Sequence, residues 1–218
     1  MSGGYTQLDD PLAGLPASGR QLVDAAKTIL LEKGFPGLTV DAVVTAAGKN
    51  KAAVKYYFGS KDGLLAAVVD SLDYEECLQF AERIRDSRGD ERLERYIEEQ
   101  AGMSSDVPGF RMFFDLLPHV ISHEHLRARV AKRYEWYYAM NVEWLGLADP
   151  TTDESRAQLT ALAALMTAVV DGLAIQVALS PAGFDLGRAY GVLLTLLRCG
   201  LDEVVGKAAE SRGSDGDR

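Results

Sequence analysis

Four lysines are gathered in residues 48–61, a segment that contains no acidic residue. A lysine ammonium group donates hydrogen bonds to phosphate oxygens and to the O6 and N7 atoms of guanine. The formal charge of the chain is −9, but residues 20–61 carry +4, which leaves −13 for the remainder. An acidic body repels a polyanion, so this basic segment is the face on which we expect double-stranded DNA to dock.

A second set of side chains has spacing that suits metal binding. Asp115, His119 and His123 are four residues apart and would share one face of an unbroken helix. Pro118 disturbs that geometry, so we predict no metal site and no cofactor. The chain also lacks GxSxG, GxGxxG and HExxH motifs, so we assign no catalytic residue and do not expect an enzyme.

An aromatic-rich region between Met103 and Trp144 is a candidate for binding a small molecule, because such sites are mostly apolar with a few polar groups. The alternative is that these aromatic residues form an ordinary core. The predicted effector pocket consists of Phe110, Phe113, Phe114, His119, Tyr134, Tyr137 and Asn141.

Short helices with polar caps position the lysines. A first helix is predicted over 19–33, where Gly34 can adopt the left-handed conformation that ends it. Thr39 is the expected N-cap of a second helix over 40–46, and Asn50 that of a third. Residues 47–49 are the expected tight turn between these two helices. Two helices joined in this way form a helix-turn-helix, whose second helix enters the major groove.

In the third helix, apolar and basic side chains fall on opposite faces. Val54, Tyr57 and Phe58 follow the i, i+3, i+4 pattern of a core face. Lys51 and Lys55 share the other face, which is therefore free to meet DNA.

The remainder of the chain also has a helical period, and no segment alternates as a strand does, so the fold class is all-α. Ser60 is the expected cap of a long fourth helix over 61–86, which joins the small domain to the rest of the chain. Further helices are predicted over 91–103, 108–122, 124–147, 152–179 and 185–207.

The last two predicted helices are apolar nearly all round. One apolar stripe of a helix can be buried in its own domain, while a second apolar stripe can be buried against a partner chain. A symmetric four-helix interface in a homodimer satisfies both, although burial of these helices within their own domain is the alternative. The expected interface comprises Leu165, Val169, Gly172, Ile175, Leu193, Leu197 and Leu201.

Composition places the chain in a reducing compartment. The two cysteines, Cys77 and Cys199, lack metal or redox spacing, and both are expected to be buried thiols. The first nineteen residues lack the features of a signal peptide, and apolar runs are interrupted, so we expect a cytoplasmic protein with no membrane partner.

The segment Thr39-Val-Asp-Ala-Val-Val-Thr-Ala-Ala-Gly48, continuing through Lys-Asn-Lys-Ala-Ala-Val-Lys-Tyr-Tyr-Phe58 and Gly-Ser-Lys61-Asp-Gly-Leu-Leu65, resembles the DNA-binding domain of the tetracycline-repressor (TetR) family. The likeness covers residues 20–69. It implies an all-α homodimer, usually a repressor that a small molecule releases from DNA.

The resemblance also implies which residues contact DNA. Thr39, Tyr57 and Lys61 correspond to places that usually hold phosphates, and the third-helix residues to places that face bases or the flanking backbone. The family often has other residues where Lys49, Asn50, Ala52 and Lys55 stand, and the operator sequence is therefore left open. The full predicted DNA-binding set is Thr39, Lys49, Asn50, Lys51, Ala52, Lys55, Tyr56, Tyr57 and Lys61.

Together these patterns predict an N-terminal three-helix DNA-binding domain over 19–65, joined by the long fourth helix to an effector-binding and dimerisation domain over 66–205. Residues 1–18 are predicted to be a disordered tail and 206–218 a flexible one. The expected function is a one-component transcriptional regulator, most simply a repressor that binds a near-palindromic operator as a dimer and is released by a small apolar or aromatic effector. The alternative is a ligand-independent DNA-binding adaptor whose C-terminal domain only dimerises.

Overall fold

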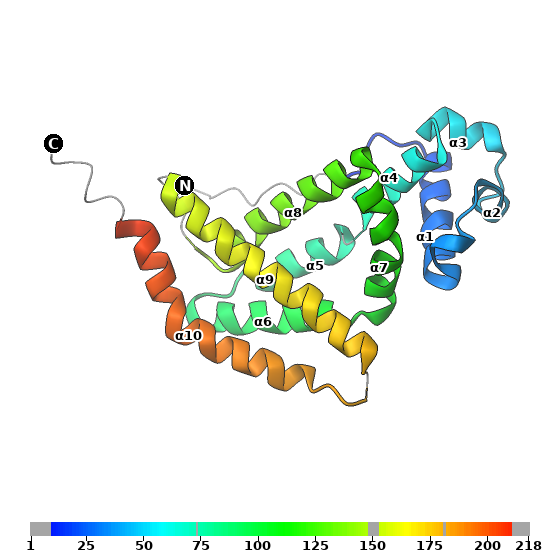
Figure 1. Cartoon of the computed structure of the whole chain (residues 1–218). Coiled ribbons are helices and arrows are strands. Elements are labelled where there is room, and N and C mark those ends of the chain that lie inside the picture. The colour runs from blue at the N-terminus through cyan, green and yellow to red at the C-terminus, as the bar shows by residue number, and fades with distance from the viewer. Residues whose placement is uncertain (1–9, 73, 148–152, 181, 211–218) are drawn as a thin grey trace. The chain divides into compact units, whose positions relative to one another are not determined.

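A computed structural model describes the chain except for residues 1–9, 73, 148–152, 181 and 211–218. The described residues form helices and no strand, which confirms the all-α class (Figure 1). The helices are α1 (Ala17–Gly37), α2 (Val40–Ala46), α3 (Lys51–Phe58), α4 (Lys61–Ser71), α5 (Tyr74–Ile84), α6 (Gly89–Ser105), α7 (Val107–Ser122), α8 (Glu124–Trp144), α9 (Asp153–Leu179) and α10 (Leu186–Glu210).

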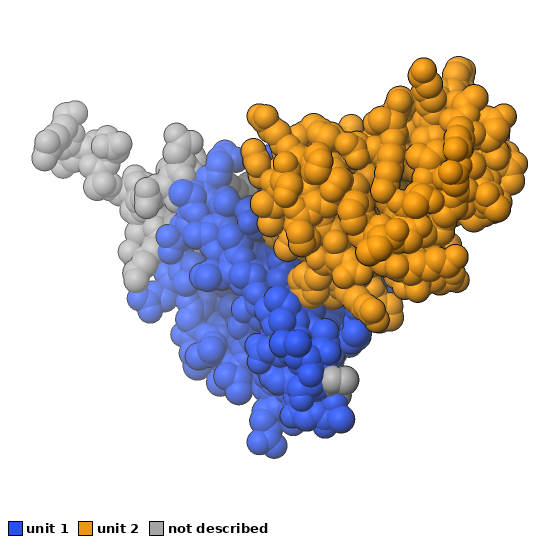
Figure 2. All heavy atoms as spheres, turned by 45° about the vertical axis from the view of Figure 1, so that its right-hand side comes forward, with its two compact units in different colours: residues 1–6, 80–107, 135–218 blue, residues 7–79, 108–134 orange. Residues whose placement is uncertain are grey.

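The chain divides into two compact units, coloured separately in Figure 2. Unit 2 contains residues 7–79 and 108–134, and unit 1 contains 1–6, 80–107 and 135–218. These units do not follow the functional boundary expected after residue 65. The reason is that α7 and the first part of α8 contribute Met112, Leu116, Val120, Leu126 and Val130 to the same apolar core as the N-terminal helices.

The core of unit 2 is enclosed by the N-terminal helices. Leu22, Val23 and Ala26 of α1 are fully buried, as is Leu65 of α4. Gly34 has a φ of 66° and a ψ of −176°: the positive φ agrees with the prediction, but ψ is extended rather than left-handed helical, and α1 resumes briefly beyond this kink. Leu38, just before α2, is buried in this core, so the segment between α1 and α2 folds back onto α1.

The prediction of one long helix over 61–86 is wrong, because α4 ends at Ser71 and α5 begins at Tyr74. Leu72 is extended, with φ −66° and ψ 142°. Two carbonyls in the last turn of α4 accept from distant cations: Lys27 Nζ donates to the Ser71 carbonyl at 3.0 Å, and Arg133 donates to that of Val69. Side-chain donors from α1 and α8 thus stabilise an end that has no glycine or proline to mark it.

Unit 1 is built around α6, which packs against α9 and α10 (Figure 1). A buried polar network joins α6 to α8: Tyr96 Oη donates to Asn141 Oδ1 at 2.6 Å, and Gln100 Nε2 donates to the same atom at 2.9 Å. Tyr190 Oη lies 2.6 Å from Ser104 Oγ. Burial raises the pKa of Tyr190 to about 12 and raises that of Tyr96 as well, so both hydroxyls stay protonated as donors.

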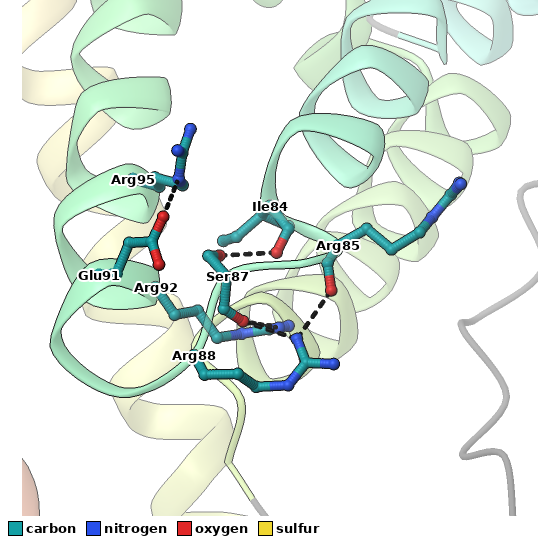
Figure 3. Close-up of polar contacts among 7 residues, drawn as sticks. All are labelled: Ile84, Arg85, Ser87, Arg88, Glu91, Arg92 and Arg95. Atoms are coloured by element: carbon teal, nitrogen blue, oxygen red, sulfur yellow. Dashed lines mark hydrogen bonds and ion pairs between the residues drawn. The ribbon is translucent and has the colours of Figure 1, made fainter.

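The corner between α5 and α6 is held by polar contacts of Ser87 and its neighbours (Figure 3). Ser87 Oγ donates to the Ile84 carbonyl at 2.7 Å, and Arg88 donates to the carbonyls of Arg85 and Ser87. The carbonyl of Ile84 at the end of α5 and two carbonyls beyond it therefore have partners between α5 and α6.

Both predicted tails are shorter than expected where the structure describes them. Asp10 accepts from the backbone N–H of Leu12 and pairs with Arg20 at 2.8 Å, and Leu12 and Leu15 pack against the core of unit 2. These contacts order residues 10–18. At the other end α10 continues to Glu210, while residues 1–9 and 211–218 lie outside the described part of the chain.

One helix of the described residues is long and apolar enough to cross a membrane by length and composition, contrary to the expectation from the sequence. Arg156–Leu179 of α9 has a mean hydropathy of 2.0 over its most apolar window, of which 28% is buried. Its inner face is buried, with Leu159, Ala163, Met166, Val170 and Ala174. A helix with one face in its own core and a second apolar face outside it reaches the same hydropathy without a membrane.

Candidate nucleic-acid interface

Polar caps begin both helices of the helix-turn-helix. Thr39 Oγ1 accepts from the backbone N–H of Ala42 at 3.1 Å, and Asn50 Oδ1 accepts from that of Ala53 at 3.0 Å. Gly48 between the helices has a φ of 62°, a conformation that costs glycine least. The predicted bounds of the second helix and both caps are confirmed.

Helix α3 has the two faces that its sequence predicts. Val54 is buried, and Tyr57 and Phe58 are half-buried against the core of unit 2. Lys51, Ala52 and Lys55 are exposed, and Tyr56 is 82% exposed. A basic and aromatic surface is thus presented on a rigid helix, which is the arrangement that contacts phosphates and base edges.

An acidic side chain outside the predicted DNA-binding set lies on this surface. The carboxylate of Asp41, in the first turn of α2, is 2.6 Å from Lys51 Nζ. Asp41 lies at the opposite end of α2 from the turn and ten residues before Lys51, so their spacing in the sequence does not by itself predict the contact.

Lys61 lies at the start of α4, next to its cap Ser60, whose Oγ accepts from the backbone N–H of Gly63 at 3.0 Å. The Lys61 Nζ lies 5.0 Å from the centre of the Phe35 ring. A cation–π contact orients the ammonium group and leaves its N–H donors available to a phosphate.

His119 of α7 also contacts Phe35. Its ring centre is 4.6 Å from that of Phe35, and Nε2 is 3.7 Å from Asp62 Oδ1, beyond hydrogen-bond distance. Burial lowers the pKa of His119, and neighbouring His123 lowers it further, against the opposing effect of Asp62. In the described part of the chain no group of three or more His, Cys, Asp or Glu residues is arranged to hold a metal ion.

The predicted effector-pocket residues are divided between the two units. Phe110, Phe113 and Phe114 make ring contacts along α7, with centres 5.7 and 6.0 Å apart for the two neighbouring pairs. His119 and Tyr134 belong to the same unit, where Tyr134 packs against the core. Tyr137 and Asn141 lie in unit 1. The pocket therefore remains a prediction.

Unit 1 contains an aromatic cluster whose members lie outside the predicted pocket set. Phe80 stacks on Trp144 with ring centres 3.9 Å apart, and the edge of Tyr96 contacts Phe80 at 6.0 Å. All three side chains are buried, and Trp144 Nε1 donates to no atom of the described residues. Such an unpaired buried donor is uncommon in folded proteins.

The predicted dimer residues differ in exposure. Leu165 is 66% exposed and Ile175 is exposed, whereas Val169, Gly172, Leu193 and Leu201 are half-buried. Leu197 is only 8% exposed, so its side chain packs within its own unit and has little surface to offer a partner. Among the α10 residues whose burial is described, the exposed large apolar side chains are Val192 and Leu196. Of the cysteines, Cys77 is buried as predicted and Cys199 is exposed, contrary to prediction.

A capped helix-turn-helix with a basic outer face, followed by a helical C-terminal region, defines a class of DNA-binding regulators. Residues 22–68 match the model of bacterial regulatory proteins of the tetR family, and residues 89–202 match that of the C-terminal domain of BetI-type transcriptional repressors. The chain belongs to the TetR family of transcriptional regulators, and its C-terminal region is of the BetI type.

Known proteins resemble the chain over most of its length. The HTH-type transcriptional regulator BetI of Vibrio vulnificus is 22% identical over 196 residues, which cover 82% of this chain and 90% of that protein. A transcriptional regulator of Saccharomonospora viridis, solved with choline, has a TM-score of 0.63 at 18% identity and covers 83% and 95% of the two chains. The multidrug binding protein EbrR, solved with imidazole, has a TM-score of 0.60 at 22% identity, with coverage of 84% and 93%, and it was also solved with malachite green. These structures share the fold.

Proposed function

We propose that this regulator is a repressor that acts in the cytoplasm and binds a near-palindromic operator as a homodimer. The observation that carries the proposal is α3, which is capped by Asn50 and exposes Lys51, Lys55 and Tyr56 on the face opposite its buried Val54. The contacts are assigned to Thr39, Lys49, Asn50, Lys51, Ala52, Lys55, Tyr56, Tyr57 and Lys61.

The homodimer is supported by the apolar surface of α9 and α10. Exposed aliphatic side chains cost free energy in water, and a second copy of the same surface can cover them. Two recognition helices would then meet successive major grooves about one helical turn apart. The exposed residues are Leu165, Ile175, Leu179, Val192 and Leu196.

A small-molecule effector is supported by two observations. Structures that share this fold were solved with choline, imidazole and malachite green. Unit 1 buries the aromatic rings of Phe80, Tyr96 and Trp144, a composition that binds aromatic or quaternary ammonium groups. Trp144 Nε1 has no hydrogen-bond partner among the residues that the structure describes. Because Phe80 and Trp144 stack on each other, such a ligand must separate them. The alternative is the ligand-independent adaptor, whose C-terminal domain only dimerises.

Selection from a random pool of duplex DNA, with the full-length protein, tests the proposal. An enriched motif with two inverted half-sites supports the dimeric operator, whereas enrichment of no motif rejects it. Choline, imidazole and malachite green are then added to the protein and selected duplex. Release of the duplex together with a raised melting temperature supports effector control, because a ligand that opposes DNA must bind the free protein more tightly. Binding of all three without release, or binding of none, favours the adaptor.

A further inference from the structure

The ion pair between Asp41 and Lys51 places a carboxylate on the face assigned to DNA. Both side chains are exposed, 70% for Asp41 and 68% for Lys51, and the distance between Oδ1 and Nζ is 2.6 Å. Lys51 is the first residue of α3, so the pair lies where a recognition helix enters the groove.

Stability does not explain this pair. Exposed ion pairs contribute little to folding, because water screens them and both side chains lose freedom. The dipole of α2 favours an acid in its first turn, but the same benefit reaches Asp62 in α4, where the acid is not paired with a lysine of α3. A carboxylate on this face also repels phosphates, so its position has a cost for DNA binding.

The pair offers chemistry that a lone lysine lacks. A lysine beside a carboxylate has a largely cancelled charge, so its attraction to phosphate is weakened, while two of its three N–H donors remain free. The carboxylate contributes an acceptor beside those donors. In the major groove a G·C pair shows the complementary pattern, with acceptors at guanine O6 and N7 and a donor at cytosine N4.

We propose that Asp41 and Lys51 act together to read one G·C base pair in each half-site. Lys51 donates to guanine O6 or N7, and Asp41 accepts from cytosine N4. The inference rests on the proposed operator binding, and it makes Asp41 a specificity-determining residue that lowers affinity for duplex DNA in general.

The test uses the full-length protein and the operator obtained by selection, with every base pair of the half-site replaced in turn. In the wild type, one G·C position should lose roughly tenfold or more in affinity when it becomes A·T. With Asp41→Asn this loss should shrink to about threefold or less, while binding to random duplex strengthens and the slope of log K against log salt steepens by about one. Asp24→Asn removes the same charge from an exposed site on α1 of the same unit and should leave the base preference unchanged.

A second variant keeps the test independent of the folding of the first. Lys51→Ala should reduce discrimination at the same base pair, and adding Asp41→Asn to it should reduce it no further. Unchanged preference in Asp41→Asn, or a preference lost at a different base pair from that lost in Lys51→Ala, overturns the inference and leaves the operator intact. A wild-type protein that selects no sequence overturns the proposed function itself.

Discussion

The helix-turn-helix and the pair α9–α10 present opposite kinds of surface. Around α3 the apolar side chains lie inside, and the outer face carries lysines and a tyrosine. On α9 and α10 leucine, isoleucine and valine remain exposed after their own unit has folded. The first region has closed its core within one chain and uses charge outside it, whereas the second has apolar surface left to bury. Association at the two surfaces should therefore respond to different perturbations.

The largest expected effect is on the apolar surface. Leu196 is 64% exposed, so Leu196→Glu should leave the fold of each chain intact but bury a carboxylate in the proposed dimer. The penalty is about 3 kcal/mol or more, roughly a hundredfold in the dissociation constant of the dimer. Light scattering should show the wild type at about twice the chain mass of 23.6 kDa and the variant shifted toward the single-chain mass.

Leu31→Glu supplies the matched control, because Leu31 is also an exposed leucine but belongs to α1 in unit 2. Its mass should equal that of the wild type. A wild type that stays monomeric at micromolar concentration would remove the distinction between the two surfaces.

The next largest effect is on DNA binding, which should depend on salt concentration whereas the apolar dimer should not. Lys61→Ala should weaken binding to operator and random duplex by the same factor, because its proposed role is to hold a phosphate, and should reduce the slope of log K against log salt by about one. The apolar dimer should persist over the same salt series. Lys33→Ala removes an exposed lysine outside residues 48–61 and should not change the slope. A change in operator preference with Lys61→Ala would contradict its role as a phosphate contact.

These two surfaces also differ in how far sequence could define them. Thr39, Asn50 and Ser60 were recognisable because a cap acts on the backbone only two or three residues away. The apolar character of α10 is readable from the sequence, but which of its leucines are exposed is not. Successive residues are rotated by about 100° around a helix, and periodicity cannot fix which edge of the apolar stripe a neighbouring helix covers. The contact of Asp41 with Lys51 and the end of α4 at Ser71 both depend on side chains from other helices.

A smaller effect is expected at the N-cap of α2, which is one of the features that the sequence could predict. Thr39→Ala removes the oxygen that accepts from the Ala42 N–H and should lower the free energy of unfolding by about 1 kcal/mol. Thr45→Ala makes the same change at an exposed site inside α2 and should be neutral or slightly stabilising, because alanine favours the helix. Urea titration of both variants measures the difference. Equal effects would mean that the cap contributes nothing.

The smallest expected effect is a pH dependence within unit 2. The pKa of His119 is lowered in the folded chain, so below its usual value of about 6.5 the unfolded chain binds more protons. Stability should be complete above pH 6.5 and should fall as the pH drops toward the folded pKa. His119→Gln should flatten this fall between pH 7 and 5, measured by urea titration, and His125→Gln on exposed His125 is the control. An equal fall in His119→Gln would exclude His119 as its source.

The end of α4 links segments that are far apart along the chain. Its last carbonyls are bonded by Lys27 from α1 and Arg133 from α8, so the final turn of α4 cannot fray alone without breaking contacts to both. In native-state hydrogen exchange, the amides of that turn should open in one cooperative step with those of α1 and the first half of α8. Residues 27, 71 and 133 would then report a single opening free energy, although more than forty residues of sequence separate each from the next.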